Sequence, residues 1–208
     1  WDHRAPILYL RSFTIDHQPV KVRPRGWTAR LIGLSGVFPT LDEAVLDCAA
    51  PYGPVIAIGD PRDPVPPLGA ARKFVGQKGD WQQVVADLAN ASQLIVMVVD
   101  STEGVRWEVK HIVNHGHAAK TLFLASPSRT PAERAASLSE VAGLLGHPEP
   151  LPKDAIGVSP SKGGGIEVMK SPTTSGDAYA VVLNLRLQQD FGLKVKFPKR
   201  GGPAASAR

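Results

Sequence analysis

The chain has 208 residues, of which 43% are hydrophobic and 21% charged, with a net charge of +5, and this composition excludes a disordered or fibrous protein. Its single cysteine, Cys48, excludes an internal disulfide framework and a zinc site built from cysteines. The sequence contains no run near the roughly 18 apolar residues of a membrane span, and residues 1–5 are too polar for a signal peptide.

The N-terminal half alternates strand and helix patterns. In chain order it predicts a strand at Ile7–Leu10, a hairpin or loop around Trp27–Leu34, a helix that begins at Thr40, a strand at Pro54–Gly59, a stiff loop at Asp60–Gly69, a helix that begins at Asp80 and a strand at Leu94–Val99. Both helices start on side chains suited to capping, Thr40 with Glu43 and Asp80 with Gln83. The first helix carries Cys48 on its apolar face, which predicts a buried structural thiol.

The C-terminal half continues this alternation. It predicts a helix at Arg106–His115, a strand at Lys120–Ala125, a helix at Ala132–Leu145 capped by Thr130, a strand at Ile166–Lys170 and a helix at Asp177–Asp190. Strands that alternate with helices favour an α/β fold, and here a flavodoxin-like parallel sheet of about five strands with helices on both faces. We expect one domain over residues 1–196 and a flexible basic tail at 197–208.

Basic residues concentrate towards the two ends of the chain. This distribution favours a solvated tail, and a nucleic-acid partner is not expected. The first residue is Trp1, which suggests a piece of a longer protein. The reducing environment indicated by the lone cysteine agrees with a cytoplasmic domain.

Candidate ligand-binding residues follow the predicted strands, because ligands of open parallel sheets bind where the carboxyl ends of the strands meet. Arg11 and Ser12 follow the first strand, and Arg72 lies beyond the proline-rich loop that follows the second. Arginine suits bidentate phosphate binding. The alternatives are a salt bridge at the sheet edge for Arg11 and a solvated surface charge for Arg72.

The most specific pattern of polar residues follows the predicted strand at Leu94–Val99. Asp100 ends the strand, Gly104 would let the backbone approach a ligand, and Glu108 lies in the first turn of the next helix, where the helix dipole favours its charge. Ser101 offers a hydroxyl, and Trp107 suits stacking on a planar ring. In the alternative interpretation Asp100 caps the helix, Trp107 fills the core and Glu108 is solvated.

Residues 81–125 resemble the middle of a Toll/interleukin-1 receptor (TIR)-like domain. The likeness rests on a helix, a strand that enters a serine-containing loop, and a helix with a Glu close to a Trp. Gly104–Glu108 also resembles the Gly-Thr-x-x-Glu run of nucleoside 2-deoxyribosyltransferases, a family of related fold. Trp107 directly precedes Glu108, whereas TIR domains place the Trp four residues before the Glu. Val105 stands where the transferases have Thr, and Leu-Arg-Ser-Phe replaces the Ile-Ser-Tyr of the first TIR strand.

The resemblance implies a nucleotide N-glycosidase with Glu108 as catalytic carboxylate. In NAD-cleaving TIR domains the corresponding Glu stabilises or attacks the ribose carbon as nicotinamide leaves. Such a reaction has an oxocarbenium-like transition state, whose main demand is a carboxylate beneath the sugar. The expected substrate-binding residues are Arg11, Ser12, Arg72, Asp100, Ser101, Gly104 and Trp107. No metal or cofactor is expected, since NAD would be the substrate.

Two further patterns are weaker. His111 and His115 are spaced i, i+4 and could bind zinc, but the sequence supplies no evident third ligand, which favours a polar helix face. Ser159–Gly165 lacks the spacing of a phosphate-binding loop, which favours a flexible loop, and the stretch Gly157–Gly165 could be a mobile lid.

The competing function is a non-catalytic TIR-like module that senses a nucleotide or assembles with copies of itself. Residues 6–13 resemble cytosolic portions of bacterial multi-pass proteins, which implies an upstream membrane anchor and a place at the cytosolic face of the inner membrane. The TIR resemblance also implies a homo-oligomer. An enzyme requires Glu108 in a concave pocket beside Arg11, whereas an assembly module could hold Glu108 in a salt bridge and expose an apolar face.

Overall fold

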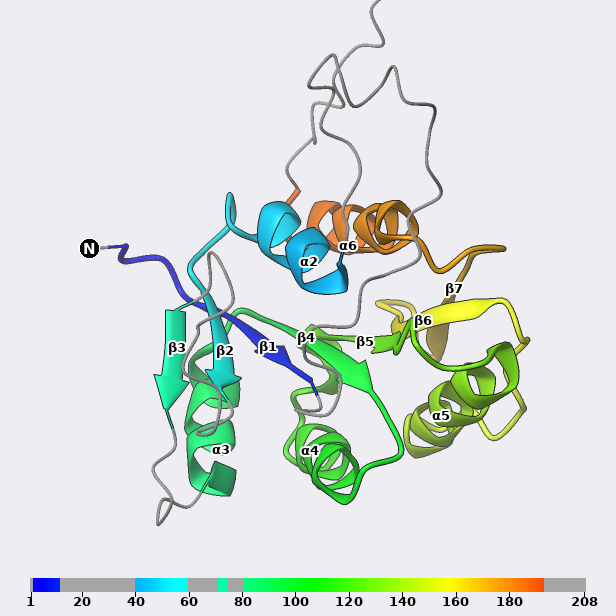
Figure 1. Cartoon of the computed structure of the whole chain (residues 1–208). Helices are drawn as coiled ribbons and strands as arrows, with labels where there is room; N and C mark the ends of the chain where they lie inside the picture. Colours follow the sequence, from blue (N-terminus) through cyan, green and yellow to red (C-terminus); the bar gives the residue numbers. More distant parts are fainter. Residues whose placement is uncertain (1, 12–39, 60–70, 75–80, 193–208) are drawn as a thin grey trace, which may run out of the picture.

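The computed structural model describes residues 2–11, 40–59, 71–74 and 81–192, which form one sheet covered by helices on both faces (Figure 1). Its strands are β1 Ile7–Leu10, β2 Val55–Gly59, β3 Ala71–Phe74, β4 Leu94–Val99, β5 Thr121–Ala125, β6 Ala155–Pro160 and β7 Ile166–Lys170. Its helices are α2 Leu41–Ala49, α3 Trp81–Ala91, α4 Glu103–Asn114, α5 Pro131–Leu144 and α6 Gly176–Phe191, with a short 3-10 turn, η2, at Ala118–Lys120. The predicted α/β class is confirmed.

The seven strands lie in the order β3-β2-β1-β4-β5-β6-β7. The first five are mutually parallel, whereas β6 is antiparallel to both β5 and β7. The prediction of about five strands was therefore too low, because it missed β3 and β6. The structure also corrects the loop or lid expected at residues 157–165, whose first four residues belong to β6.

Gly157 explains why β6 was missed. A Cβ atom at this position would lie 3.1 Å from Leu124 Cδ2 and 3.2 Å from the Phe123 carbonyl oxygen. Glycine is needed here because β5 and β6 approach closely. In the sequence, however, a glycine at this position suggests a loop and not a strand.

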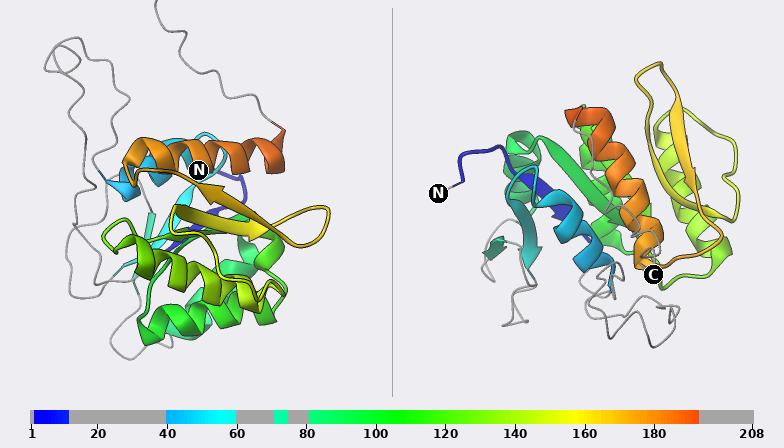
Figure 2. Two further views of the ribbon diagram at one scale, coloured as in Figure 1. Left: turned by 90° about the vertical axis from the view of Figure 1, so that its right-hand side faces the viewer. Right: turned by 90° about the horizontal axis from the view of Figure 1, so that it is seen from above.

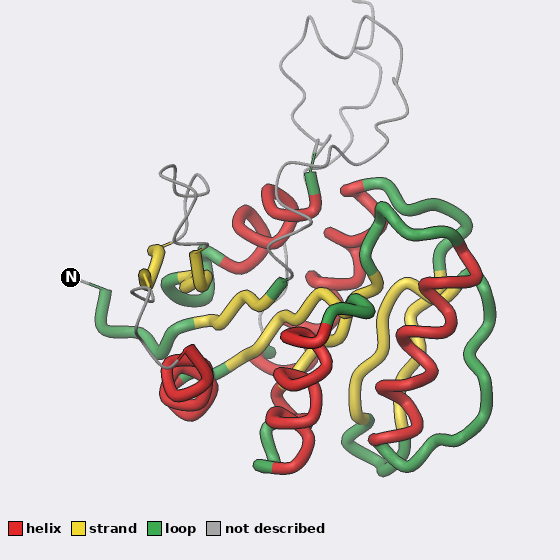
Figure 3. Tube along the Cα trace, turned by 60° about the horizontal axis from the view of Figure 1, so that its bottom comes forward, coloured by secondary structure: helices red, strands yellow, loops and turns green. Residues whose placement is uncertain are grey.

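Two helix layers enclose the sheet. Helices α2 and α6 pack together on one face, and α3, α4 and α5 cover the other (Figures 2 and 3). Strand β4 is buried along its whole length, and its alternate residues enter the two opposite cores. This burial explains its unbroken apolar sequence.

The two predicted helix caps that lie among the described residues, at Thr40 and Thr130, both form. The Thr40 hydroxyl accepts from the Glu43 amide at the start of α2, and Thr130 and Glu133 form a reciprocal capping box at the start of α5. Cys48 is buried as predicted, and burial raises the pKa of its thiol to about 11. None of the helices in the described ranges combines the length and apolar character of a membrane span.

Several predictions lie outside the described residues. They concern the hairpin or loop around Trp27–Leu34, the loop at Asp60–Gly69, the cap at Asp80 and the basic tail at 197–208.

The turn between α2 and β2 contains the tightest glycine among the described residues. A Cβ at Gly53 would lie 2.6 Å from the Ala5 carbonyl oxygen and 2.7 Å from Gln93 Nε2. We expect Gly53→Ala to lower the free energy of unfolding by about 1–3 kcal/mol, because backbone must shift to admit the methyl group. Urea unfolding would measure this loss.

Gly143 in α5 provides the matched control. A Cβ there meets nothing within 4 Å, so Gly143→Ala should stabilise the domain by about 0.5–1 kcal/mol through helix propensity. Equal effects of the two substitutions would contradict the packing argument.

Candidate functional site

The candidate site lies where the chain changes direction across the sheet. From β1 the chain adds β2 and β3 on one side and then returns to add β4 on the other. The carboxyl ends of β1 and β4 are therefore neighbours, and open α/β sheets bind ligands at such a point. Arg11 follows β1, Asp100 follows β4, and α4 begins three residues later.

Glu108 is the unusual side chain of this region. It lies on the face of α4 that carries Val105, Val109 and Ile112 against the sheet, and only 9% of its surface is exposed. Its Oε2 atom is buried and has no hydrogen-bond partner among the residues that the structure describes. Burial raises the pKa of Glu108 to about 8 because the charged form loses its solvation. The alternative of a solvated Glu108 is therefore wrong. Its predicted place in the first helical turn is also wrong, because α4 begins at Glu103 and Glu108 is the sixth residue.

Arg11 forms an ion pair with an acidic residue that the sequence did not indicate. Its side chain is 9% exposed and forms an ion pair with Asp42 in the first turn of α2. The Tyr9 hydroxyl donates to the same carboxylate over 2.6 Å, and the Arg11 guanidinium lies 5.7 Å from the centre of the Tyr9 ring. Arg11 thus forms the sheet-edge salt bridge that was the alternative to phosphate binding.

Asp100 is held in a similar way. Its side chain is 1% exposed, and Arg129 donates to it from Nε over 3.0 Å and from Nη2 over 3.1 Å. The Ser101 amide donates a third bond of 2.7 Å to the carboxylate. Asp100 therefore joins the ends of β4 and β5. The helix cap that was its alternative role falls to Thr102, which has no side-chain capping bond.

The other expected site residues are placed differently. Ser101 is exposed, and Gly104 lies in the first turn of α4, where an added Cβ would have open space. Trp107 packs edge-on against Trp81 of α3, with ring centres 4.9 Å apart. This contact makes it part of the packing between α3 and α4. Ser12 lies outside the described residues, as does the side chain of Arg72 on β3.

The histidine pair extends the aromatic contact along α4. Trp107 stacks on His111 at 4.9 Å and His111 on His115 at 4.0 Å between ring centres. Partial burial and the neighbouring His115 lower the pKa of His111. The described residues contain no group of three or more side chains arranged to hold a metal ion.

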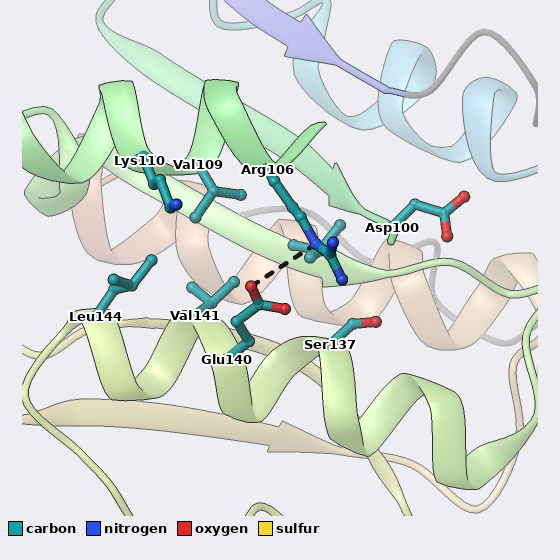
Figure 4. Close-up of a pocket in the computed structure, with 9 residues that line it drawn as sticks. Asp100, Arg106, Val109, Lys110, Ser137, Glu140, Val141 and Leu144 are labelled. Carbon is teal, nitrogen blue, oxygen red and sulfur yellow. Dashed lines mark ion pairs between the residues drawn. The ribbon is translucent and has the colours of Figure 1, made fainter. Parts of the chain in front are cut away.

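A shallow pocket lies between α4 and α5 (Figure 4). Its walls come from α4 and α5, and Arg106 forms a 3.8 Å ion pair with Glu140 across it. Asp100 lies at one end of this pocket, and Glu108 does not line it. The pocket therefore does not bring Glu108 and Arg11 together, as the enzymatic interpretation requires.

In comparisons with known proteins, no family model matches the chain, no curated protein is significantly similar to it, and no solved structure has a significantly similar fold.

Proposed function

We propose that this chain is a nucleotide N-glycosidase that cleaves the nicotinamide–ribose bond of NAD or a related bond, with Glu108 as the catalytic carboxylate. One observation carries the proposal: Glu108, on the helix that follows β4, has a buried carboxyl whose Oε2 atom lacks a hydrogen-bond partner among the described residues. An unsatisfied buried carboxyl costs stability, and such groups concentrate at functional sites.

A TIR-like assignment belongs to the same proposal. The five parallel strands have the order β3-β2-β1-β4-β5. Without the short edge strand β3, the remaining order β2-β1-β4-β5, with helices on both faces, supports the flavodoxin-like sheet that the sequence resemblance implies. In that assignment α4 is the helix that carries the family's glutamate, and Glu108 occupies the matching position.

The chemistry follows from the environment of Glu108. The bond between ribose carbon and nicotinamide nitrogen breaks, and its electron pair stays on nicotinamide, which leaves as a neutral molecule. Ionised Glu108 stabilises the positive charge that develops on the ribose, in a site where low polarity strengthens the attraction. Water then bonds to the ribose carbon and releases a proton. The bound pyridinium ring is itself positive, so it lowers the raised pKa of Glu108 and favours the ionised form.

The test is incubation of concentrated, deliberately clustered protein with NAD, with nicotinamide release followed by chromatography. We expect Glu108→Gln to lower the rate by about a hundredfold or more, since it removes the charge that the transition state requires. Release by the wild type should increase as the pH rises towards 8, where Glu108 ionises.

Glu103→Gln is the matched control, because Glu103 lies on the same helix and is exposed. It should release nicotinamide at the wild-type rate. Unchanged release by Glu108→Gln would refute the catalytic role of Glu108.

A specific observation favours the second candidate, a non-catalytic TIR-like module that senses a nucleotide or self-assembles within a membrane-anchored signalling protein. Arg11 and Asp100, two of the expected substrate-binding residues, are already engaged in internal ion pairs. If clustered wild-type protein leaves NAD intact, this candidate replaces the enzyme.

A further inference from the structure

Among the described residues Arg134 and Arg186 are buried, and the side chain of Arg11 is only 9% exposed. Two of these three arginines have an acidic partner. Arg11 pairs with Asp42, and Arg186 pairs with Asp190 over 2.7 Å. Arg134 is 8% exposed and has no carboxylate within ion-pair distance in the described part of the chain. A buried charge without a counter-ion is costly, and native proteins normally supply one.

The hydrogen bonds of the Arg134 guanidinium are also incomplete. Its Nη1 donates to the Arg129 carbonyl oxygen over 2.7 Å, whereas its buried Nε has no acceptor within the described ranges. A guanidinium has five N–H groups arranged for planar, bidentate contact with an oxyanion. The unsatisfied Nε belongs to that fork.

The bond to Arg129 places the guanidinium under the turn between β5 and α5. Arg134 is the fourth residue of α5, so it lies at the positive end of the helix dipole, where a cation is disfavoured. Tyr179 lies nearby: its hydroxyl donates to the Ala125 carbonyl over 2.8 Å, and the Arg134 charge opposes the rise that burial causes in the Tyr179 pKa. Both the helix end and the burial favour an anion beside Arg134.

The turn also supplies neutral polar groups. Ser126 is 1% exposed, and its hydroxyl lies 2.9 Å from that of Ser128, which is exposed. The acids of this region are already engaged. Asp100 accepts from Arg129, and Glu133 accepts from the Thr130 amide and hydroxyl in the capping box.

We propose that Arg134 binds an oxyanion, either free phosphate or the phosphate group of a nucleotide, at the β5–α5 turn, with the Ser126 and Ser128 hydroxyls beside it. This site uses none of the side chains proposed for N-glycosidic cleavage. The anion site therefore does not depend on whether Glu108 is catalytic.

The test compares wild-type protein with Arg134→Met, which keeps an unbranched apolar stem and removes the charged guanidinium group. Inorganic phosphate is titrated against chloride at constant ionic strength, and binding is measured by equilibrium dialysis and by the unfolding temperature. We expect saturable binding and a rise in Tm for the wild type, and an affinity about tenfold or more weaker for Arg134→Met. Without phosphate the variant should be at least as stable as the wild type, because a buried charge without a counter-ion has been removed.

Arg106→Met, which removes an exposed cation on α4, should bind phosphate like the wild type. Ser128→Ala gives a second variant that leaves the buried guanidinium in place, and it should weaken binding severalfold. AMP that binds more tightly than phosphate would assign the anion to a nucleotide, and equal binding would assign it to free phosphate. Absence of saturable phosphate binding to the wild type, or equal affinity in Arg134→Met, would overturn the site.

Discussion

The free energy of unfolding of the wild-type protein is expected to fall as the pH rises from about 5 to about 8, and Glu108→Met should remove most of this fall. In the folded protein, burial raises the pKa of Glu108 from 4.5 to about 8. In the unfolded chain the carboxyl ionises near its ordinary pKa. Below pH 4.5 both states are protonated, and Glu108 contributes no pH dependence.

Between these two pKa values the unfolded state binds fewer protons than the folded state, so stability decreases with increasing pH. A pKa difference of this size corresponds to a total on the order of 5 kcal/mol, at about 1.4 kcal/mol per pH unit. At pH 8 Glu108→Met should therefore be more stable than the wild type by several kcal/mol. Such a gain at the expense of activity is typical of residues retained for function.

Urea unfolding at half-unit pH intervals from 5 to 9 measures this difference. Glu103→Gln serves as the control, because Glu103 is exposed on the same helix. Parallel pH profiles for wild type and Glu108→Met would show that Glu108 ionises normally in the folded protein. That result would remove the main physical argument for its special role.

Arg129→Met is expected to lower the free energy of unfolding by about 3 kcal/mol, the second large effect. The substitution leaves the Asp100 carboxylate, whose side chain is 1% exposed, with one hydrogen bond from the Ser101 amide. Asp100→Asn should cost less, since the Arg129 side chain is 39% exposed and water can solvate it. The expected order of the two losses follows from this difference in burial.

Urea unfolding at pH 7 measures both losses, with Arg106→Met as the control. Arg106 forms an ion pair in which both side chains are more than half exposed, so its loss should cost about 0–1 kcal/mol. If Arg129→Met and Arg106→Met cost the same, Asp100 is not a buried charge held by Arg129. Asp100 would then be available for the ribose contact that the sequence suggested.

The sequence by itself determined the five helices and five of the seven strands of the described residues. Thr130 and Glu133 are three residues apart, so their capping box needs no partner from elsewhere in the chain, and it forms as the pattern predicts. The continuous apolar run of β4 likewise predicts a strand covered on both faces, and the structure buries all six of its residues. Helix positions and the α/β class follow from such short-range patterns.

The tertiary structure decided the partners of the charged residues. Asp100 and Arg129 are 29 residues apart, and Arg11 and Asp42 are 31 apart. Their pairing depends on the order of the strands and on how each helix is turned against the sheet. The same packing buries Glu108 and Arg134 without a carboxylate or cation beside them in the described residues. Burial changes the free energy of a charge far more than any sequence neighbour does. The sequence could therefore single out Glu108 but not its burial, and the Arg134 site became visible only in the fold.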